Sequence, residues 1–332
     1  MGAAAELLCA ALRVPIALRL MSAPDAIDPE IRAARAAQAA AATPFDITTL
    51  PIAEGRELSN AAALFFNDGT PEVATVETIA IDGPASTLRA RIFKPGATER
   101  ALLYLHGGGW VTCNVDTHDS VMRRLSLAAN AIVVGVDFRL APEHPFPAPL
   151  DDAIAAWRWL VANAAALGVP DTKLGVAGDS GGASLALALA IAERDAGRPY
   201  PHASALFYGA FAPQFDTPSH ARNGGGAYGL TTERMRWYWR QYVPGALDSA
   251  PPLAAPLRAN LAGLRAHHLS LADLDVIADD TRLLHEKFAA VGIPSELEEW
   301  KGAVHGFIQM GRDVALARQA IAKAGDFLKR RL

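Results

Sequence analysis

Two glycine-rich segments carry the residue types that serine-based acyl transfer needs. Residues 178–182, Gly-Asp-Ser-Gly-Gly, fit the pattern Gly-x-Ser-x-Gly, which places a serine at a sharp turn between a strand and a helix. Residues 106–110, His-Gly-Gly-Gly-Trp, fit the loop whose backbone N–H groups stabilise a developing oxyanion. Each motif alone is weak, because short Gly/Ser stretches recur by chance. Their pairing in this order, each after an apolar run, predicts Ser180 as a nucleophile.

A serine hydroxyl is a weak nucleophile without a base, and His305 is the best candidate for that base. It follows a predicted strand and a short loop, so its ring can lie over the carboxyl edge of a sheet. The acid should come between the serine and the histidine in the chain. Asp275 is preferred because it directly follows the predicted strand 269–274. The competing carboxylates are Asp273, Asp279 and Asp280, of which Asp279 better fits the start of a helix.

The motifs also predict how the rest of the site is built. The oxyanion donors are expected to be the backbone N–H groups of Gly108, Gly109 and Gly181. The bulky residues Trp110, Phe211 and Phe215 are expected to lie near the substrate pocket. We expect His106 to hold the glycine loop by side-chain hydrogen bonds. Glu143 and Asp151 are interpreted as structural, and His267 and His268, which precede a predicted strand, should lie at the opposite edge of the sheet.

Elements that could position these residues alternate along most of the chain. After an antiparallel pair, short apolar runs alternate with helical segments, which predicts a mostly parallel sheet covered on both faces. The predicted strands are 73–81, 87–93, 101–106, 131–138, 173–178, 203–208, 269–274 and 295–300, and the predicted helices include 150–167, 180–196 and 314–332.

Two stretches fall outside this alternation and predict a helical cap. Residues 1–70 are Ala-rich and helical in pattern, and residues 209–255 contain no clear strand but an aromatic helix around position 237. The α/β core is then 71–208 and 256–332. Residues 224–229 satisfy Gly-x-Gly-x-x-Gly by chance, and no strand precedes them, which argues against dinucleotide binding.

Composition excludes several classes of protein. The 332 residues carry a formal net charge of −4 and no basic run, so nucleic acid is not an expected partner. The two cysteines, Cys9 and Cys113, form neither a disulfide framework nor a metal pattern, and no metal or other cofactor is expected. The apolar run 3–12 is too short to span a bilayer and lacks the basic start of a secretory signal. We therefore expect a cytoplasmic protein without stable membrane insertion, and leave a homodimer open.

The chain resembles the bacterial hormone-sensitive-lipase-like (family IV) esterases of the α/β-hydrolase superfamily. The matching segments are 106–109 (His-Gly-Gly-Gly), 139–148 (Arg-Leu-Ala-Pro-Glu-His-Pro-Phe-Pro-Ala), 178–182 and 305–307 (His-Gly-Phe), within a match over about residues 70–330. The resemblance implies an α/β-hydrolase fold with an eight-stranded, mostly parallel sheet flanked by helices, a helical cap, and esterase activity on short acyl chains without a cofactor. It also selects Asp275 as the acid.

Two positions depart from the pattern of that family. The residue after the serine is usually Ala and here is Gly181, which still offers its backbone N–H. The acid usually stands in Asp-Pro-Leu, whereas residues 275–277 are Asp-Val-Ile. Both departures keep the functional group that the chemistry needs.

The sequence therefore predicts a serine carboxylesterase that hydrolyses small acyl esters through an acyl-enzyme. A lactone or amide hydrolase with the same triad is an alternative that motifs do not separate, because all pass through an acyl-enzyme. A non-catalytic small-molecule receptor is an alternative of another class. Plant gibberellin receptors resemble the same family without the catalytic histidine, so the presence of His305 argues against a receptor.

Overall fold

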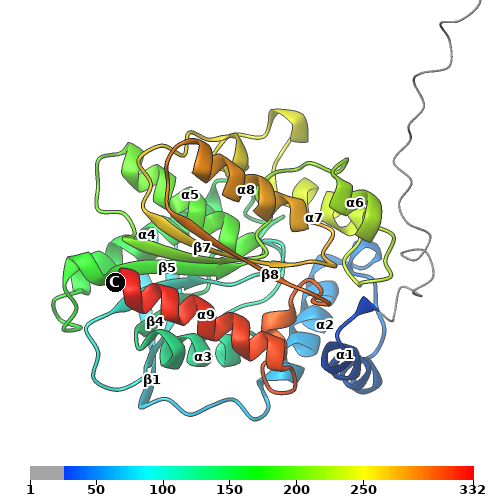
Figure 1. Cartoon of the computed structure of the whole chain (residues 1–332), viewed down its shortest axis with the longest axis horizontal. Helices are drawn as coiled ribbons and strands as arrows, with labels where there is room; N and C mark the ends of the chain where they lie inside the picture. Colours follow the sequence, from blue (N-terminus) through cyan, green and yellow to red (C-terminus); the bar gives the residue numbers. More distant parts are fainter. Residues whose placement is uncertain (1–25) are drawn as a thin grey trace, which may run out of the picture.

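An eight-stranded sheet forms the centre of the molecule in a computed structural model that describes residues 26–332 (Figure 1). The strand order is β1-β2-β4-β3-β5-β6-β7-β8. The strands are β1 (Thr75–Asp82), β2 (Thr87–Lys94), β3 (Ala101–Leu105), β4 (Ile132–Val136), β5 (Leu174–Asp179), β6 (Ala203–Phe207), β7 (Ala266–Ala272) and β8 (Ser295–Trp300). β2 runs antiparallel to both neighbours, and all other pairs are parallel. The predicted α/β-hydrolase sheet is confirmed.

Helices cover both faces of this sheet. The helices α3 (Asp119–Ala129) and α9 (Ala315–Arg331) lie on one face, and α4 (Ala148–Asn163), α5 (Gly181–Asp195) and α8 (Ala278–Ala290) lie on the other (Figure 1). Every residue of β3, β4, β5 and β6 is buried, because a parallel strand between two helical layers contacts apolar side chains on both faces. This explains why these strands are mostly apolar, with Asp179 at the end of β5 and Ser204 in β6 as buried polar exceptions. β1, at the sheet edge, is mostly exposed.

β7 differs from the predicted strand 269–274 at both ends. It begins at Ala266 and ends at Ala272, so His267 and His268 lie inside the strand rather than before it. The His267 ring stacks on Phe288 with 4.3 Å between ring centroids, and its Nδ1 contacts the Ser204 hydroxyl. Burial lowers the pKa of His267 to about 3 and that of His268 to about 4. Both histidines are neutral core residues, which a hydrophobic pattern does not count as apolar.

Four further helices lie together beyond the carboxyl ends of the parallel strands (Figure 1). They are α1 (Pro29–Ala41), α2 (Ile52–Leu64), α6 (Pro218–Asn223) and α7 (Thr232–Tyr242). The N-terminal and inserted segments meet where Arg35 Nη1 donates to the Tyr228 carbonyl at 3.3 Å and where Arg234 lies 3.7 Å from Asp46. The glycine-rich residues 224–229 connect α6 to α7 and follow no strand.

The apolar run 3–12 and the first part of the predicted cap fall outside the described residues. Among residues 26–332, no helix combines the length and apolar character needed to cross a bilayer.

Candidate active site

Ser180 stands at the sharp turn between β5 and α5. Its backbone has φ 53° and ψ −123°, a left-handed conformation that is strained for a residue with a β-carbon. The two flanking glycines make the turn possible. A β-carbon on Gly178 would lie 2.6 Å from the Gly182 carbonyl oxygen, and one on Gly182 would collide with the backbone of β3. The motif glycines are therefore required by close backbone approach.

Ser180, His305 and Asp275 form one hydrogen-bonded chain. His305 Nε2 lies 2.9 Å from Ser180 Oγ, and His305 Nδ1 lies 2.6 Å from Asp275 Oδ2. The three residues come from the turn after β5, the loop after β8 and the loop after β7. Parallel strands end at the same edge of the sheet, which brings these distant positions together.

The loop that carries Asp275 is held on several sides. Asp275 Oδ1 accepts a hydrogen bond from the Ile277 N–H at 3.1 Å, and the side chain of Asp275 is fully buried. Asn223, the last residue of α6, donates to the carbonyl of Asp275 at 2.9 Å and to that of Asp273 at 3.2 Å. The inserted segment therefore braces the turn that aims Asp275 at His305.

The competing carboxylates make other contacts. Asp273 accepts from the Gly302 N–H at 2.8 Å. Asp279 lies in the first turn of α8, where it accepts from the Ser219 N–H at 2.7 Å and pairs with Arg282 at 2.7 Å. Asp280 accepts from the N–H groups of Phe211 and Ala212, and burial raises its pKa to about 8. Of the four, Asp275 alone contacts His305 among the described residues.

The environment of His305 raises the pKa of its imidazole. Burial by itself disfavours the charged ring and lowers this pKa, but the negative charge of Asp275 and its hydrogen bond to Nδ1 outweigh burial. An imidazole with a raised pKa is a stronger base for the Ser180 proton, provided that the ring is neutral at the working pH.

The glycine loop leaves β3 beside the serine turn. Gly108 and Gly109 have φ 109° and 59°, and a β-carbon on Gly109 would collide with the Tyr238 ring. Within residues 26–332, the N–H groups of Gly108, Gly109 and Gly181 have no hydrogen-bond acceptor. They are therefore available to a bound oxygen atom next to Ser180.

A cavity of about 330 Å³ opens above Ser180. Its wall combines the serine turn and glycine loop with residues of α1, α2, α7 and the loop before α7. The large apolar side chains in the wall are Trp110 after the glycine loop, Phe66 after α2, Leu230, Met235 and Tyr238. The predicted pocket residue Trp110 is in this wall, whereas Phe211 and Phe215 are not. Phe211 is fully buried in the core beneath, and the Phe215 ring lies 4.3 Å from the Arg236 guanidinium. The sequence pattern identified these rings as large apolar residues near the cavity, but it contains no information on the direction of their side chains.

Comparison with known proteins agrees with this architecture. The family described as having the α/β-hydrolase fold matches residues 102–309. The chain is 38% identical to Esterase LipI of Mycobacterium tuberculosis over 258 residues, which cover 75% of this chain and 80% of that protein. This protein is a hormone-sensitive-lipase-like α/β-hydrolase. The hydrolase is also 36% identical to Carboxylesterase NlhH of Mycobacterium tuberculosis, over 79% of this chain and 84% of that protein.

A solved structure shows how far the likeness extends in space. The hyperthermophilic esterase from the archaeon Pyrobaculum calidifontis superposes with a TM-score of 0.85 at 32% sequence identity. The match covers 92% of the hydrolase and 98% of that structure. The relatives are named as an esterase, a carboxylesterase and an acetyl esterase. As a member of this family, the hydrolase is a carboxylic ester hydrolase.

Asp179 is a site residue of the hydrolase that sequence reasoning missed. Its fully buried Oδ1 accepts from the Tyr104 hydroxyl at 2.7 Å and from the Gly107 N–H at 2.9 Å, and it lies 3.4 Å from His118 Nε2. Burial alone would raise the pKa of Asp179, but His118 and these hydrogen bonds lower it. Asp179 thus locks the glycine loop to the serine turn. A charged residue beside the nucleophile, between two apolar runs, was the available signal.

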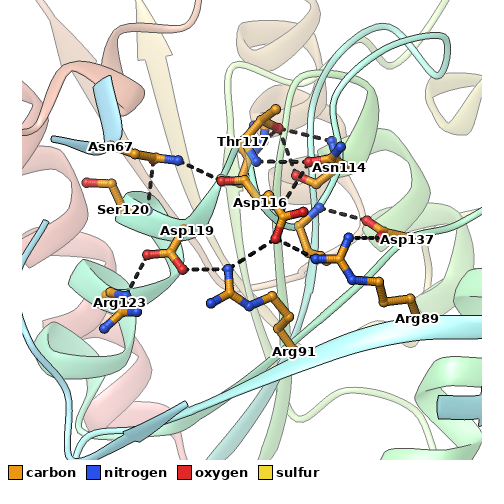
Figure 2. Close-up of polar contacts among 12 residues, drawn as sticks. Asn67, Arg89, Arg91, Asn114, Asp116, Thr117, Asp119, Ser120, Arg123 and Asp137 are labelled. Atoms are coloured by element: carbon orange, nitrogen blue, oxygen red, sulfur yellow. Dashed lines mark hydrogen bonds and ion pairs between the residues drawn. The ribbon is translucent and has the colours of Figure 1, made fainter. Parts of the chain in front are cut away.

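A polar network holds the chain that follows the glycine loop (Figure 2). Asp116 pairs with both Arg89 and Arg91 of β2, and Arg91 also pairs with Asp119 at 2.7 Å. Asn67 donates to the Asp116 carbonyl at 2.6 Å, which ties the N-terminal segment to the same loop. Arg89 and Arg91 are two residues apart in β2, and this spacing brings both side chains to one face of the strand.

Other motif residues of the hydrolase have structural contacts. Glu143 pairs with Arg56 of α2 at 2.8 Å, and Arg56 Nε donates to the Val111 carbonyl at 2.8 Å, so this pair fastens α2 to the glycine-loop region. Asp151 lies in the first turn of α4. The buried carboxylate there is its neighbour Asp152, which binds the Arg139 guanidinium through both oxygens. His106 Nδ1 contacts the Gly107 carbonyl at 2.8 Å, as expected for a residue that holds the loop.

Gly181, one of the two departures from the family pattern, lies against Trp110. A β-carbon at Gly181 would lie 3.1–3.3 Å from three atoms of the Trp110 indole, which is a tight contact. Trp110 is itself stacked on Tyr242 with ring centroids 4.1 Å apart and is 1% exposed. Glycine at position 181 lets this indole pack directly on the start of α5.

Proposed function

We propose that the hydrolase cleaves short-chain carboxylic esters through an acyl-enzyme formed on Ser180. The observation that carries this proposal is the continuous hydrogen-bonded chain from Ser180 Oγ through His305 to Asp275 at the floor of a cavity. The unpaired N–H groups of Gly108, Gly109 and Gly181 beside that serine support it. The relatives named as esterases support the same reaction class.

In the first half-reaction, Ser180 Oγ attacks the carbonyl carbon of the ester and its proton passes to His305 Nε2. The carbonyl oxygen becomes an oxyanion, which the three glycine N–H groups stabilise; one such donor contributes roughly 3–4 kcal/mol to the transition state. When the tetrahedral intermediate collapses, the bond to the alkoxide breaks and His305 protonates the leaving alcohol. Asp275 fixes the imidazole tautomer and stabilises the imidazolium.

In the second half-reaction, water enters where the alcohol was. His305 Nε2 takes a proton from this water, whose oxygen attacks the acyl carbon. Collapse of the second intermediate breaks the bond to Ser180, and the proton returns from His305 to Ser180 Oγ. The carboxylic acid then leaves and the enzyme is restored. The two helical segments that line the cavity limit the size of the substrate.

The decisive experiment is a burst assay with a p-nitrophenyl ester of a short acid. We expect a rapid release of p-nitrophenol in proportion to enzyme, followed by steady turnover, if acylation of Ser180 is faster than hydrolysis. A phosphonate ester should label Ser180 stoichiometrically and block turnover. Labelling of another residue, or turnover that survives full labelling, contradicts the proposed mechanism.

We expect kcat/KM to rise with pH. Only neutral His305 accepts the serine proton, and its pKa is raised by Asp275, so the midpoint should lie above the ordinary histidine value of about 6.5. The residual activity of an Asp275→Asn variant should have its midpoint at lower pH, because the raising charge is gone. A pH profile of both proteins on one p-nitrophenyl ester measures this. An unchanged midpoint would mean that another group controls the rate.

We expect a preference for acyl chains of about two to six carbons. Each methylene that the cavity holds adds about 0.8 kcal/mol of binding, which is about fourfold in kcat/KM, until the roof is reached and the gain reverses. The cavity volume of about 330 Å³ and the residues of α1, α2 and α7 in its wall motivate this limit. A p-nitrophenyl ester series from acetate to palmitate measures the profile. A maximum at laurate or longer, or activation by an emulsified interface, contradicts it.

A further inference from the structure

An arginine without an acidic partner lies in the wall of the cavity above Ser180. Arg35, on α1, is half-buried, and its Nη1 donates to the Tyr228 carbonyl at 3.3 Å. Within residues 26–332, no carboxylate lies within ion-pair distance of its guanidinium. Other half-buried arginines pair with carboxylates, for example Arg91 with Asp119 and Arg139 with Asp152.

The position of Arg35 is unfavourable for the empty protein. Burial lowers the pKa of its guanidinium, and no nearby negative charge offsets this effect. Arginine has five N–H donors in a planar fork, so a single carbonyl leaves most of them unused. The Gly229 backbone packs on the guanidinium, since a β-carbon there would lie 3.0 Å from Nη2. The fork is therefore held in place while its donors stay available.

The other charges around the cavity reinforce this positive site. Arg234, from α7, also lines the wall, and its partner Asp46 lies 3.7 Å away and half-exposed. The carboxylate among the lining residues is Asp179, which is buried and already accepts from Tyr104 and Gly107. A substrate in this cavity thus meets two cationic side chains and no free carboxylate among the described lining residues.

We propose that the preferred substrates of this hydrolase are esters that also carry a carboxylate, and that Arg35 binds this carboxylate. A planar guanidinium matches a carboxylate with two parallel hydrogen bonds, and a partly desolvated site strengthens them. Arg234 adds attraction without direct pairing. The inference rests on the ester hydrolysis proposed above and adds the charge of its substrate.

Two pairs of matched esters test the proposal, because the carboxylate can belong to the acid or to the alcohol. Monomethyl adipate is compared with its primary amide, methyl 6-amino-6-oxohexanoate, and 4-acetoxybenzoate with 4-acetoxybenzamide. Each pair differs only in carboxylate against carboxamide. Values of kcat/KM are measured at low salt and about pH 8, where carboxylates are ionised, and each is divided by the rate of alkaline hydrolysis. The pair that responds tells which end of the ester lies near Arg35.

We expect the carboxylate member of at least one pair to be favoured by about tenfold or more in the wild-type enzyme. In Arg35→Met, which keeps the length of the side chain but not the charge, this preference should fall by a similar factor. Arg35→Lys should retain part of it, because an ammonium keeps the charge without the fork. Arg32→Met is the matched control, since Arg32 is exposed on the same helix and outside the cavity wall. Added salt should weaken the preference.

The outcomes separate the substrate proposal from the proposed reaction. The substrate proposal is wrong if kcat/KM is equal for the carboxylate-bearing and carboxamide-bearing esters of both pairs. It is also wrong if Arg35→Met lowers kcat/KM equally for both members of a pair. Arg35 is then a brace between α1 and the loop that carries Tyr228. The ester hydrolysis would still stand in that case. If the enzyme hydrolyses neither the four esters nor p-nitrophenyl acetate, the proposed reaction is wrong, and the substrate proposal is wrong with it. Circular dichroism and thermal melting show that each variant is folded.

Discussion

Replacement of Ser180 by Ala is expected to lower kcat by about 10⁶-fold, the loss that follows removal of the nucleophile in other serine hydrolases. The alanine removes only the oxygen that attacks the ester carbon. The turn itself should survive, because its strained φ of 53° is imposed by β5 and α5 rather than by the hydroxyl. Purified Ser180→Ala should therefore melt near the wild-type temperature and show no burst with p-nitrophenyl acetate.

The matched control for this variant is Ser184→Ala. Ser184 lies one turn further along α5, is also buried and forms no side-chain contact with His305 among the described residues. It should keep most of the wild-type turnover. Retention of more than a few per cent of activity by Ser180→Ala, after exclusion of contaminating esterase, would remove the assigned nucleophile.

Replacement of Asp275 by Asn is expected to lower kcat by about 10⁴-fold, as the equivalent change does in serine proteases. An amide can donate to Nδ1 and favour the tautomer that carries its proton on Nε2, where the Ser180 proton must be accepted. The amide also lacks the charge that raises the pKa of His305 and stabilises the imidazolium. The measurement is steady-state kinetics across pH, which separates the loss of base strength from the loss of orientation.

Asp273→Asn is the closest control for this prediction. Asp273 lies two residues away in the same loop and accepts from the Gly302 N–H, without contact to the histidine. Its substitution should cost less than about tenfold in kcat. If Asp279→Asn or Asp273→Asn proved more damaging than Asp275→Asn, the acid would have been misassigned.

The elements that carry short-range information were predictable from the sequence. The runs at β3, β4, β5 and β6 are mostly apolar because both faces of a central parallel strand are buried, and such runs need no knowledge of the rest of the fold. The glycines at 178 and 182 were predictable for a similar reason, since each is required by a close backbone contact at a single turn. The start of β7 was missed because its buried histidines do not look apolar.

Contacts across the chain were not predictable in the same way. The direction of Phe211 and Phe215 depends on how the insertion packs, and periodicity contains no term for that packing. The roles of Asp179 and Asp152 became clear when their partners Tyr104, Gly107 and Arg139 were seen beside them, although the position of Asp179 next to the nucleophile was a sequence signal. Buried carboxylates need such partners, and the partners come from distant segments.

The sequence by itself determined the chemistry that is available, because a nucleophile turn, a glycine loop and a late histidine are local patterns with fixed backbone requirements. The sequence favoured Asp275 among the competing aspartates, but the contacts that separate them come from the tertiary structure: the loop after β7 turns Asp275 toward His305, whereas Asp273 and Asp279 accept hydrogen bonds from Gly302 and Ser219. The tertiary structure also decided that Arg35 lies in the cavity wall above Ser180, because α1 packs beside the loop before α7. Side-chain direction at loops and between helices is set by packing energy summed over the whole fold, which no window of residues contains.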